Sequence, residues 1–342
     1  MALTKRKEKI YQQKKRILVT GIAGFVGSHF CDEVLKTTNW DIVGIDSLNY
    51  AGNLDRVTDS EVFDPKRVKF IRHDLKNHFS KTVRRLIGKV DYLIHFAAES
   101  HVDRSLKDSI PFVKSNLLGT ANLLEYLKKY QPDCRSLIFS TDEVFGTAPE
   151  GVYFKENDAH RPSNPYAASK SGEEMLAFSF AHAFGLPISI VRSMNIIGER
   201  QHPEKFVPKI IRAILRNEKV ILHGRGKEDL SSRCWIHARN VADALLFLFN
   251  RQEKGEFYHI VGEERTVLEI ANWISEVIKR RKLKEEEIKW IDYHRARPGH
   301  DKRYALSGEK MAKMGWKPPV DLENSLKKCV KWTLKHRKWL NL

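Results

Sequence analysis

The sequence predicts an α/β fold: a doubly wound parallel sheet followed by a smaller, mixed α/β region at the C-terminal end. Three observations favour this fold. Short apolar runs alternate with stretches of helical periodicity. A glycine-rich turn follows the first apolar run, and hydroxyl and carboxylate side chains follow the fifth. Ligands of open α/β sheets bind where the parallel strands end, so both places are candidate sites.

Six apolar runs are predicted strands, and they are residues 16–20, 41–46, 68–74, 91–96, 136–139 and 187–192. Helical periodicity predicts helices over residues 28–35, 116–130 and 166–184. A polar loop with prolines lies between the fifth strand and the last of these helices. From residue 194 onward the pattern is less regular, with short strands and helices in alternation.

A glycine-rich turn joins the first strand to the first helix. It contains Gly21, Gly24, Phe25, Val26 and Gly27. Strand, glycine turn and helix in this order are typical of a phosphate-binding loop. Glycines let backbone N–H groups approach a pyrophosphate, and a helix N-terminus attracts negative charge. The spacing is GxxGxxG rather than GxGxxG, so a tight turn without a ligand is the alternative.

A carboxylate ends the second strand. Asp46 lies about 20 residues past the glycine turn, as expected for an acid that binds the adenosine ribose hydroxyls; capping a turn is its alternative role. A carboxylate there repels a 2′-phosphate, which favours NAD over NADP, although Arg56 leaves some room for NADP. Asp74 and Leu75 are expected beside the adenine, and Ala97 beside the diphosphate and ribose. Together these positions predict a Rossmann-type sheet that binds NAD.

The predicted organisation has three parts. Residues 1–15 are expected to form a basic, flexible arm, residues 16–193 an NAD-binding Rossmann domain, and residues 194–342 a nucleotide-sugar-binding region. No linker cleanly separates the last two parts, so the boundary between them is expected to be interleaved.

The polar residues after the fifth strand are Thr141, Asp142 and Glu143, and Tyr166 and Lys170 follow one helical turn apart from each other. An ammonium beside a phenol favours the phenolate. Lys170 is therefore expected to lower the pKa of Tyr166, so that Tyr166 removes a proton from an alcohol while hydride leaves for the nicotinamide. Thr141 is expected to share the hydrogen bond to that alcohol.

The adjacent carboxylates of Asp142 and Glu143 distinguish elimination from oxidation alone. Two neighbouring carboxylates hold different protonation states when their surroundings push their pKa values apart. One can then remove a proton beside a newly formed ketone while the other protonates a leaving hydroxyl. An ordinary polar loop is the alternative interpretation of this pair.

Composition and charge limit the other classes of function. The chain has no apolar run long enough to span a membrane and no secretory signal at its N-terminus. The four cysteines are far apart, which argues against a metal site or a disulfide scaffold and favours buried thiols in the cytoplasm. The net charge of +17 is compatible with nucleic-acid binding, but no interleaved aromatic and basic motif accompanies it.

These residues resemble the extended short-chain dehydrogenase/reductase superfamily, and within it the nucleotide-sugar 4,6-dehydratases of the dTDP-glucose 4,6-dehydratase type. The glycine turn and the Tyr166–Lys170 pair are shared by the whole superfamily. The Thr-Asp-Glu triplet and the segment around His101 are specific to this branch. The matching segments are residues 21–27, 46–54, 96–105, 141–144, 166–170, 202–205 and 297–304.

The resemblance implies a lyase with tightly held NAD that acts on a nucleotide-diphosphate sugar. Tyr166 would take the C4 hydroxyl proton while hydride passes from C4 to NAD. Glu143 would remove the C5 proton, and Asp142 would protonate the departing C6 hydroxyl. Hydride would then return to C6 and give a 4-keto-6-deoxy sugar. The residues implied to bind the substrate are Ser100, Asn195, Lys205, Arg233 and Arg297. The resemblance also implies a homodimer whose helices near 115–130 and 164–184 form a four-helix interface.

Three places depart from the family's usual pattern. Phe145 stands where Tyr is usual, residues 193–198 read Ser-Met-Asn-Ile-Ile-Gly instead of Ser-Asn-Asn-Tyr-Gly, and His259 stands where Asn is usual. All three are expected at the sugar or nucleotide site. Because of these departures, the sequence does not identify the nucleotide base or the sugar of the substrate. The departures are also compatible with a 5,6-dehydratase like those of the tunicamycin pathway. Such an enzyme returns hydride to C4 and stops at a 5,6-unsaturated sugar.

Other functions remain as alternatives. A 4-epimerase needs no acid–base pair for elimination, and a decarboxylase usually has Ser where Asp142 stands. A non-catalytic NAD-binding or nucleic-acid-binding protein is the alternative from another class. The positive charge supports it, whereas the intact Thr141, Tyr166 and Lys170 count against it.

Overall fold

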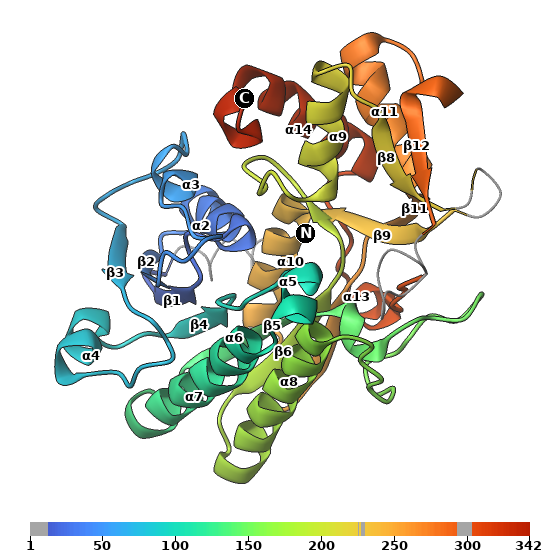
Figure 1. Cartoon of the computed structure of the whole chain (residues 1–342). Coiled ribbons are helices and arrows are strands. Elements are labelled where there is room, and N and C mark those ends of the chain that lie inside the picture. The colour runs from blue at the N-terminus through green and yellow to red at the C-terminus, as the bar shows by residue number, and fades with distance from the viewer. Residues whose placement is uncertain (1–12, 225, 227–229, 293–302) are drawn as a thin grey trace.

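The computed structural model describes residues 13–224, 226, 230–292 and 303–342. Its largest sheet has seven strands in the order β10-β6-β5-β4-β1-β2-β3, and neighbouring strands run parallel (Figure 1). The strands are β1 (Arg16–Thr20), β2 (Asp41–Asp46), β3 (Val68–Arg72), β4 (Tyr92–His95), β5 (Arg135–Thr141), β6 (Ile188–Ser193) and β10 (Phe257–Ile260). The predicted Rossmann-type parallel sheet is confirmed.

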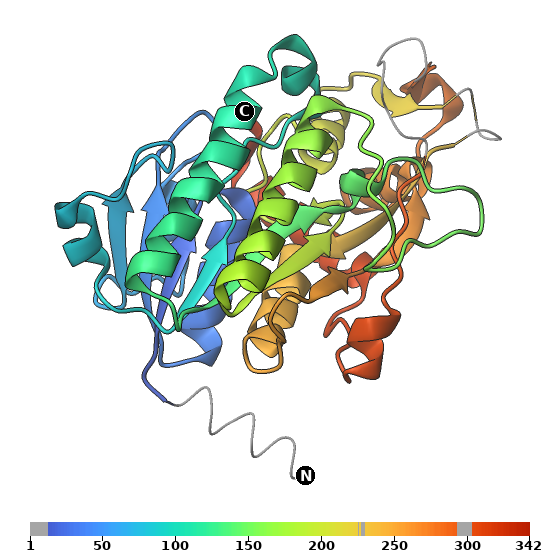
Figure 2. The same ribbon diagram turned by 90° about the horizontal axis from the view of Figure 1, so that it is seen from below.

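Helices cover both faces of this sheet, and β1 shows why its sequence is continuously apolar. Ile17 and Val19 pack into the core under α2 and α10, whereas Leu18 packs into the core under α7 and α8. A parallel sheet that is buried on both faces needs apolar residues at every position of its central strands. Figure 2 shows α7 and α8 side by side across one face. These four helices are α2 (Phe25–Thr37), α10 (Ala238–Phe249), α7 (Gly119–Tyr130) and α8 (Pro165–Phe184).

The C-terminal region has a core of its own beside the strand ends. A three-stranded sheet, β11-β9-β7, and a two-stranded sheet, β12-β8, pack with three amphipathic helices. These elements are β7 (Ile196–Ile197), α9 (Phe206–Leu215), β8 (Val220–His223), β9 (Ser232–His237), β11 (Glu263–Thr266), α11 (Val267–Lys279), β12 (Ile288–Ile291) and α14 (Leu322–Lys335). The predicted boundary at residue 193 stays a prediction. Two later elements, α10 and β10, belong to the larger sheet and its cover.

Shorter elements connect these layers. They are α3 (Asp55–Thr58), α4 (Lys81–Ile87), α5 (Val102–Lys107), α6 (Ile110–Phe112), a π-helical turn (Val113–Leu118), a 3-10 turn (Asp142–Phe145), α13 (Glu309–Lys313) and two further 3-10 turns (Glu285–Glu287 and Arg337–Leu340). The π-helical turn leads directly into α7, so one bent helical segment runs from Ile110 to Tyr130.

The parallel strands bring their carboxyl ends to one edge of the sheet. Thr20, Asp46 and Thr141 end β1, β2 and β5 at this edge. Thr141 lies in register with Ser193 on β6, and the 3-10 turn follows directly. Residues from distant parts of the chain therefore meet where ligands of such sheets bind.

The cysteines lie in the interior of the protein. All four cysteines are buried free thiols, as predicted. Within the described ranges, no helix is long and apolar enough to cross a membrane, and no cluster of His, Cys, Asp and Glu has the arrangement of a metal site.

Trp40 provides a test of this packing. It is fully buried, stacks on Tyr92 with ring centres 4.5 Å apart, and meets Phe249 of α10 edge-on at 6.2 Å. We expect Trp40→Ala to lower the free energy of unfolding by about 3–5 kcal/mol, because it leaves a cavity under α10. Urea denaturation followed by circular dichroism measures the loss. Trp332→Ala, at a partly exposed stack on His336, is the control and should cost clearly less. Equal losses would contradict a rigid core around Trp40.

Candidate active site

The glycine turn packs too closely for larger side chains. Gly21 has a φ of +73°, and a Cβ there would lie 2.7 Å from the backbone nitrogen of Ala97. A Cβ at Gly27 would lie 2.2 Å from the carbonyl oxygen of Gly21. After Gly24, α2 begins without a side-chain cap, so amides of its first turn are available to an anion. This cradle has the form that a pyrophosphate needs.

A cavity lies between the glycine turn and the ends of β2, β3 and β4. Seven of the predicted residues line it, and they are Gly21, Gly24, Asp46, Asp74, Leu75, Ala97 and Ser100. Phe25, Val26 and Gly27 lie in the first turn of α2, next to this cavity wall. The Asp46 carboxylate accepts the N–H groups of Ala23 (3.0 Å) and Leu48 (2.8 Å). Burial raises the pKa of Asp46, and these two hydrogen bonds lower it.

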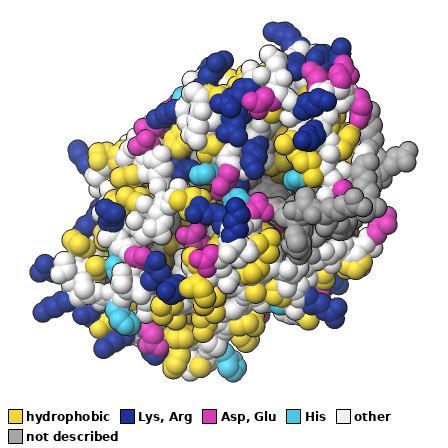
Figure 3. Space-filling model, in the orientation of Figure 1, with side chains coloured by type: hydrophobic (Ala, Val, Ile, Leu, Met, Phe, Trp, Pro, Cys, Tyr) yellow, Lys and Arg dark blue, Asp and Glu magenta, His cyan; other side chains and the backbone are white. Residues whose placement is uncertain are grey.

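Contacts around Tyr50, which also lines the cavity, join the two halves of the chain. The Tyr50 hydroxyl donates to Glu204 at 3.4 Å, and the Arg104 guanidinium lies 3.6 Å from the centre of the Tyr50 ring. His101 Nε2 lies 3.6 Å from the other Glu204 oxygen. Figure 3 shows acidic, basic and histidine side chains together near the middle of this face.

Thr141 and Asp142 form the start of the second part of the site. The Thr141 hydroxyl accepts the Glu143 N–H (3.3 Å) and donates to Asp142 Oδ1 (3.1 Å). Asp142 is 4% exposed, and its Oδ2 has no hydrogen-bond partner among the described residues. Burial, and then the charge of Glu143, raise the pKa of Asp142 to about 8. Asp142 therefore carries a proton at neutral pH.

Glu143, the next residue, has a more polar setting. Its Oε2 accepts from Asn164 Nδ2 at 3.3 Å and from the Tyr304 hydroxyl at 3.5 Å. Asn164 is also the N-cap of α8, where its side chain accepts the Ala167 N–H at 2.9 Å. The start of α8 therefore fixes the position of Glu143, and the two neighbouring carboxylates have different surroundings.

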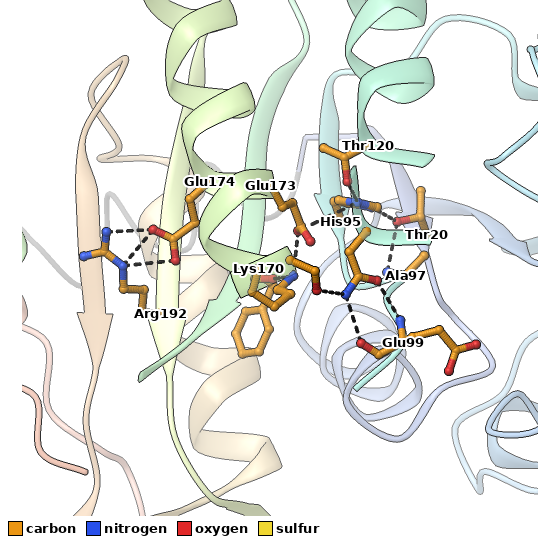
Figure 4. Close-up of polar contacts among 12 residues, drawn as sticks. Thr20, His95, Ala97, Glu99, Thr120, Lys170, Glu173, Glu174 and Arg192 are labelled. Atoms are coloured by element: carbon orange, nitrogen blue, oxygen red, sulfur yellow. Dashed lines mark hydrogen bonds and ion pairs between the residues drawn. The ribbon is translucent and has the colours of Figure 1, made fainter. Parts of the chain in front are cut away.

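Tyr166 and Lys170 both project from α8 into the buried side of the site. Tyr166 is hydrogen-bonded to Thr141, which joins α8 to the end of β5. Lys170 Nζ donates to the Phe139 carbonyl at 2.8 Å and to Glu173 Oε1 at 2.6 Å (Figure 4). Thr141, Asp142, Glu143, Tyr166 and Lys170 thus form one connected group.

The predicted direction of the Tyr166 pKa is wrong for the structure as it stands. Burial raises the pKa of Tyr166 well above its usual value, and the charges of Glu143 and Glu173 raise it further. The hydrogen bond from Tyr166 to Thr141 acts in the opposite direction. Lys170, which was expected to lower this pKa, has a buried carboxylate as its nearest partner.

The residues implied to bind substrate fall into different places. Ser100 is exposed at the cavity, Asn195 lies between β6 and β7, and Lys205 directly precedes α9. Arg233 lies near Asp142: its charge lowers the pKa of Asp142, and its guanidinium lies 5.0 Å from the centre of the Tyr304 ring. Arg297 lies outside the described residues.

Of the residues at the three departures from the family pattern, Phe145, Met194 and His259 are buried rather than exposed at the site, contrary to the prediction, whereas Asn195 beside Met194 is half-buried. Phe145 and Met194 are 2% and 3% exposed and pack in one apolar cluster with Val144, Cys234 and Leu306. His259 is fully buried, with its Nε2 3.1 Å from Arg192 Nη1, and its ring meets Phe145 at 5.8 Å. These residues support the 3-10 turn that contains Asp142 and Glu143 from behind.

Asn116 is a buried part of the site that the sequence pattern does not reveal. It lies in the π-helical turn, and its amide donates to the Glu99 carbonyl (3.0 Å) and to Ser169 Oγ (2.8 Å). The side-chain oxygen of Asn116, Oδ1, accepts the Glu99 N–H at 2.8 Å. Asn116 therefore ties the cavity-lining loop after β4 to α8. A local irregularity of the helix places it there, and helical periodicity gives no signal for such an irregularity.

Known proteins share this fold and sequence pattern. A family model described as GDP-mannose 4,6 dehydratase matches residues 18–329. The chain belongs to this family. The dTDP-D-glucose 4,6-dehydratase of Mus musculus is 35% identical over 332 residues, which cover 96% of this chain and 91% of that protein. The predicted resemblance to the nucleotide-sugar 4,6-dehydratases is confirmed.

Solved structures agree with this assignment. The dTDP-glucose 4,6-dehydratase of Bacillus anthracis in complex with NAD has a TM-score of 0.84 and 32% identity, over 96% of this chain and 99% of that one. A UDP-glucose 4-epimerase of Thermus thermophilus, also in complex with NAD, has a TM-score of 0.81 and 28% identity, over 92% and 98%. Dehydratases and epimerases therefore share this architecture.

The high pKa of Asp142 makes stability depend on pH. Unfolded Asp loses its proton near pH 4, whereas folded Asp142 keeps it up to about pH 8. Folding of the wild type therefore takes up a proton in this window, and wild-type stability falls as the pH rises. The Asp142→Asn variant takes up no proton at this position when it folds. Its free energy of unfolding, relative to that of the wild type, should therefore increase by up to about 1.4 kcal/mol per pH unit between pH 5 and 8.

Urea denaturation at a series of pH values measures this difference. Asp133→Asn, at an exposed turn, controls for the loss of a surface carboxylate. A stability difference between Asp142→Asn and the wild type that stays constant across this range would mean that Asp142 is ionised in the folded protein.

Proposed function

We propose that the protein is an NAD-dependent nucleotide-sugar 4,6-dehydratase, which converts a nucleotide-diphosphate hexose into its 4-keto-6-deoxy form. The pair of carboxylates after β5 carries this proposal. Asp142 is buried and protonated, and Glu143 next to it accepts two hydrogen bonds. Elimination of water needs an acid and a base on neighbouring atoms of the sugar, in addition to the base that oxidation at C4 requires.

The cavity at the strand ends supports NAD as the cofactor. The amides of the glycine turn and of α2 would hold the diphosphate, and the Asp46 carboxylate would bind the adenosine ribose. Asp74 and Leu75 would lie beside the adenine. Bound NAD supplies a hydride acceptor at C4 of the sugar and later a hydride donor at C6.

Tyr166 and Thr141 would act on the C4 hydroxyl. Their side chains are hydrogen-bonded to each other at the end of β5, so one alcohol oxygen can contact both. Tyr166 would remove the proton as a phenolate while the C4–H bond breaks. Because burial raises its pKa in the cofactor-free protein, the positive charges of Lys170 and of the oxidised nicotinamide would have to stabilise the phenolate. Water is excluded from this step, because Tyr166 and Lys170 are 8% and 3% exposed.

Asp142 and Glu143 would carry out the elimination. Glu143 removes the C5 proton, which is acidic once C4 is a ketone, and Asn164 and Tyr304 hold its carboxylate in place. Asp142 gives its proton to the C6 hydroxyl, which leaves as water. The Oδ2 of Asp142 has no hydrogen-bond partner among the described residues, so it can carry that proton toward a ligand.

The substrate would extend from this group into the C-terminal region. Ser100, Asn195, Lys205 and Arg233 are proposed to bind it, and cationic side chains suit a diphosphate. Arg297 is proposed for the same role from the sequence alone. The residue assignments and the division into an NAD-binding part and a sugar-binding part are part of this proposal. The four buried thiols fit a reducing compartment such as the cytoplasm.

A homodimer is proposed through the helical face that contains α7 and α8. Large apolar side chains that are 40–56% exposed gather on the elements of this face, and they are Leu106, Ile110, Val113, Leu118, Tyr130, Met175, Phe178 and Phe184. An apolar face of this extent is typical of an interface between subunits. A second copy would pair its own α7 and α8 with these helices as a four-helix interface.

A product assay tests the activity. The purified protein is incubated separately with dTDP-glucose, UDP-glucose, UDP-N-acetylglucosamine, and GDP- and CDP-sugars, and the products are followed by mass spectrometry and NMR. We expect one sugar to lose water and to show a 6-methyl group next to a 4-ketone. Glu143→Gln should still oxidise C4 but retain the C5 proton, so NADH should accumulate on the enzyme.

Other products would overturn the proposal in distinct ways. A 5,6-alkene would make the protein a 5,6-dehydratase, and inversion at C4 without loss of water would make it an epimerase. Normal turnover by the Glu143→Gln variant would show that Glu143 is not the base that removes the C5 proton. No change in any sugar would favour a non-catalytic binding protein.

Sedimentation measures the oligomeric state. The wild type should sediment at twice the 39.7 kDa mass of the chain, and Met175→Glu should shift it toward the monomer, because a charge would be buried in the interface. Ile221→Glu, at an equally exposed apolar residue on β8, should leave the dimer intact. A wild-type monomer would contradict the proposed interface.

A further inference from the structure

Glu173 is a buried carboxylate for which the proposed reaction has no use. It is fully buried on α8, and its Oε1 accepts from Lys170 Nζ at 2.6 Å. Its Oε2 has no hydrogen-bond partner among the described residues. Burial of a carboxylate costs free energy unless a cation compensates its charge. Glu173 therefore requires the Lys170 ammonium to stay beside it.

The neighbouring Glu174 does not share this role. Its carboxylate accepts three hydrogen bonds from Arg192, at 3.1, 3.0 and 2.7 Å. Figure 4 shows that the Glu173 and Glu174 side chains point in opposite directions, toward Lys170 and toward Arg192. The charge of Glu174 is therefore balanced on β6, and Glu173 is the carboxylate that faces Lys170.

The elements packed around Glu173 place few other charges beside it. His95 of β4 lies 4.0 Å from Glu173 Oε1, and its two ring nitrogens are 2.6 Å from Thr20 Oγ1 and 2.9 Å from Thr120 Oγ1. Burial and the charge of Lys170 lower the pKa of His95 to about 3, so His95 is neutral. Thr20 of β1 and Thr120 of α7 contribute only hydroxyl groups.

The groups on α8 itself complete these surroundings. Lys170 lowers the pKa of Glu173, and the charge of Glu174 raises it. The charge of Glu173 in turn raises the pKa of Tyr166. Lys170 is thus the cation that compensates Glu173, and the same ammonium is the one expected to favour the Tyr166 phenolate.

We propose that Glu173 is a positioning residue, whose carboxylate holds the Lys170 ammonium against the Phe139 carbonyl and sets how much positive charge reaches the Tyr166 phenol. The inference rests on the proposed function in that Tyr166 is the base for the C4 hydroxyl. Glu173 does not line the cavity at the strand ends, and it acts through its contact with Lys170.

The pair has a defined dependence on pH. Burial raises the pKa of Glu173 to about 7. Below that pH the carboxyl group is neutral, and the Lys170 charge acts on Tyr166 unopposed. Above it the carboxylate offsets this charge, so ionisation of Tyr166 is displaced to higher pH. Removing the Glu173 charge should therefore make Tyr166 easier to ionise, and the effect should be largest above neutral pH.

A substrate-free measurement tests this directly. The full chain is loaded with NAD and labelled with carbon-13 at the tyrosine ring, and Tyr166→Phe identifies the Tyr166 signal. The signal should titrate about one pH unit lower in Glu173→Gln than in the wild type. Glu173→Asp keeps the charge and should restore much of the wild-type titration. Glu173→Met, which is also uncharged, replaces Glu173→Gln if the latter does not fold.

Activity provides the second measurement. The acidic limb of the pH–rate profile for C4 oxidation should move to lower pH in Glu173→Gln, by a similar amount, without a matching change in KM. The matched control is Glu125→Gln on α7. There Glu125 accepts from Lys128 at the same 2.6 Å and the same three-residue spacing, but the pair is exposed. Its profile should coincide with the wild type.

The outcomes separate this inference from the proposed function. A Tyr166 titration that is identical in the wild type and Glu173→Gln overturns the inference, whatever the protein catalyses. Loss of thermal stability in Glu173→Gln with an unchanged titration would leave Glu173 a purely structural role. A wild type that dehydrates no nucleotide sugar, with a shifted Tyr166 titration, would overturn the dehydratase and leave the inference standing.

Discussion

The buried ion pair between Arg192 and Glu174 is the contact on which the position of α8 depends. Arg192 on β6 is 1% exposed and Glu174 is fully buried, so each would be very costly without the other. Arg192 also donates to the Glu156 carbonyl at 2.9 Å, and its guanidinium lies 4.7 Å from the centre of the Phe145 ring. One side chain thereby joins β6, α8, the loop before α8 and the 3-10 turn Asp142–Phe145.

This anchoring decides where the reactive groups lie. β6 pairs with β5, so a helix fixed to β6 places its first turns over the end of β5. Tyr166 then reaches Thr141, and Asn164 reaches Glu143. The chemistry of the site follows from these short connections, because Asp142 and Glu143 share a turn but not their surroundings. Asp142 is desolvated, whereas Glu143 is hydrogen-bonded.

Much of this arrangement could be predicted from the sequence. The first two strands were predicted with their observed ends, because their apolar runs are bounded by charged or glycine residues. The glycine turn, Asp46, Asp74 and Ala97 were predicted separately, and they line one cavity. Their common signal is that each follows a strand of the same parallel sheet, whose carboxyl ends necessarily meet.

The errors have physical causes that a sequence does not display. The pairing of β10, the strand that contains His259, with β6 was not predicted, because only tertiary packing brings the two strands together. The pKa of Tyr166 was predicted from its spacing to Lys170, but burial and the charge of Glu173 outweigh that spacing. Phe145 and His259 were placed at the substrate from their family positions, whereas they pack against each other behind the 3-10 turn.

The π-helical turn before α7 has a consequence for which sequence changes the chain can tolerate. Removing one residue from Val113–Leu118 would restore a regular helix and improve its local hydrogen bonding. A deletion at Leu117 would also shift Asn116 by one position, which is about 100° around the helix axis, relative to α7. Asn116 would then turn away from Glu99 and Ser169, while Leu118 and the helical face beyond it would stay in place. A shortened chain could therefore fold and pair with a second copy, yet lose the shape of the cavity-lining loop after β4. The extra residue therefore makes the helix less regular, but it keeps Asn116 directed at Glu99 and Ser169.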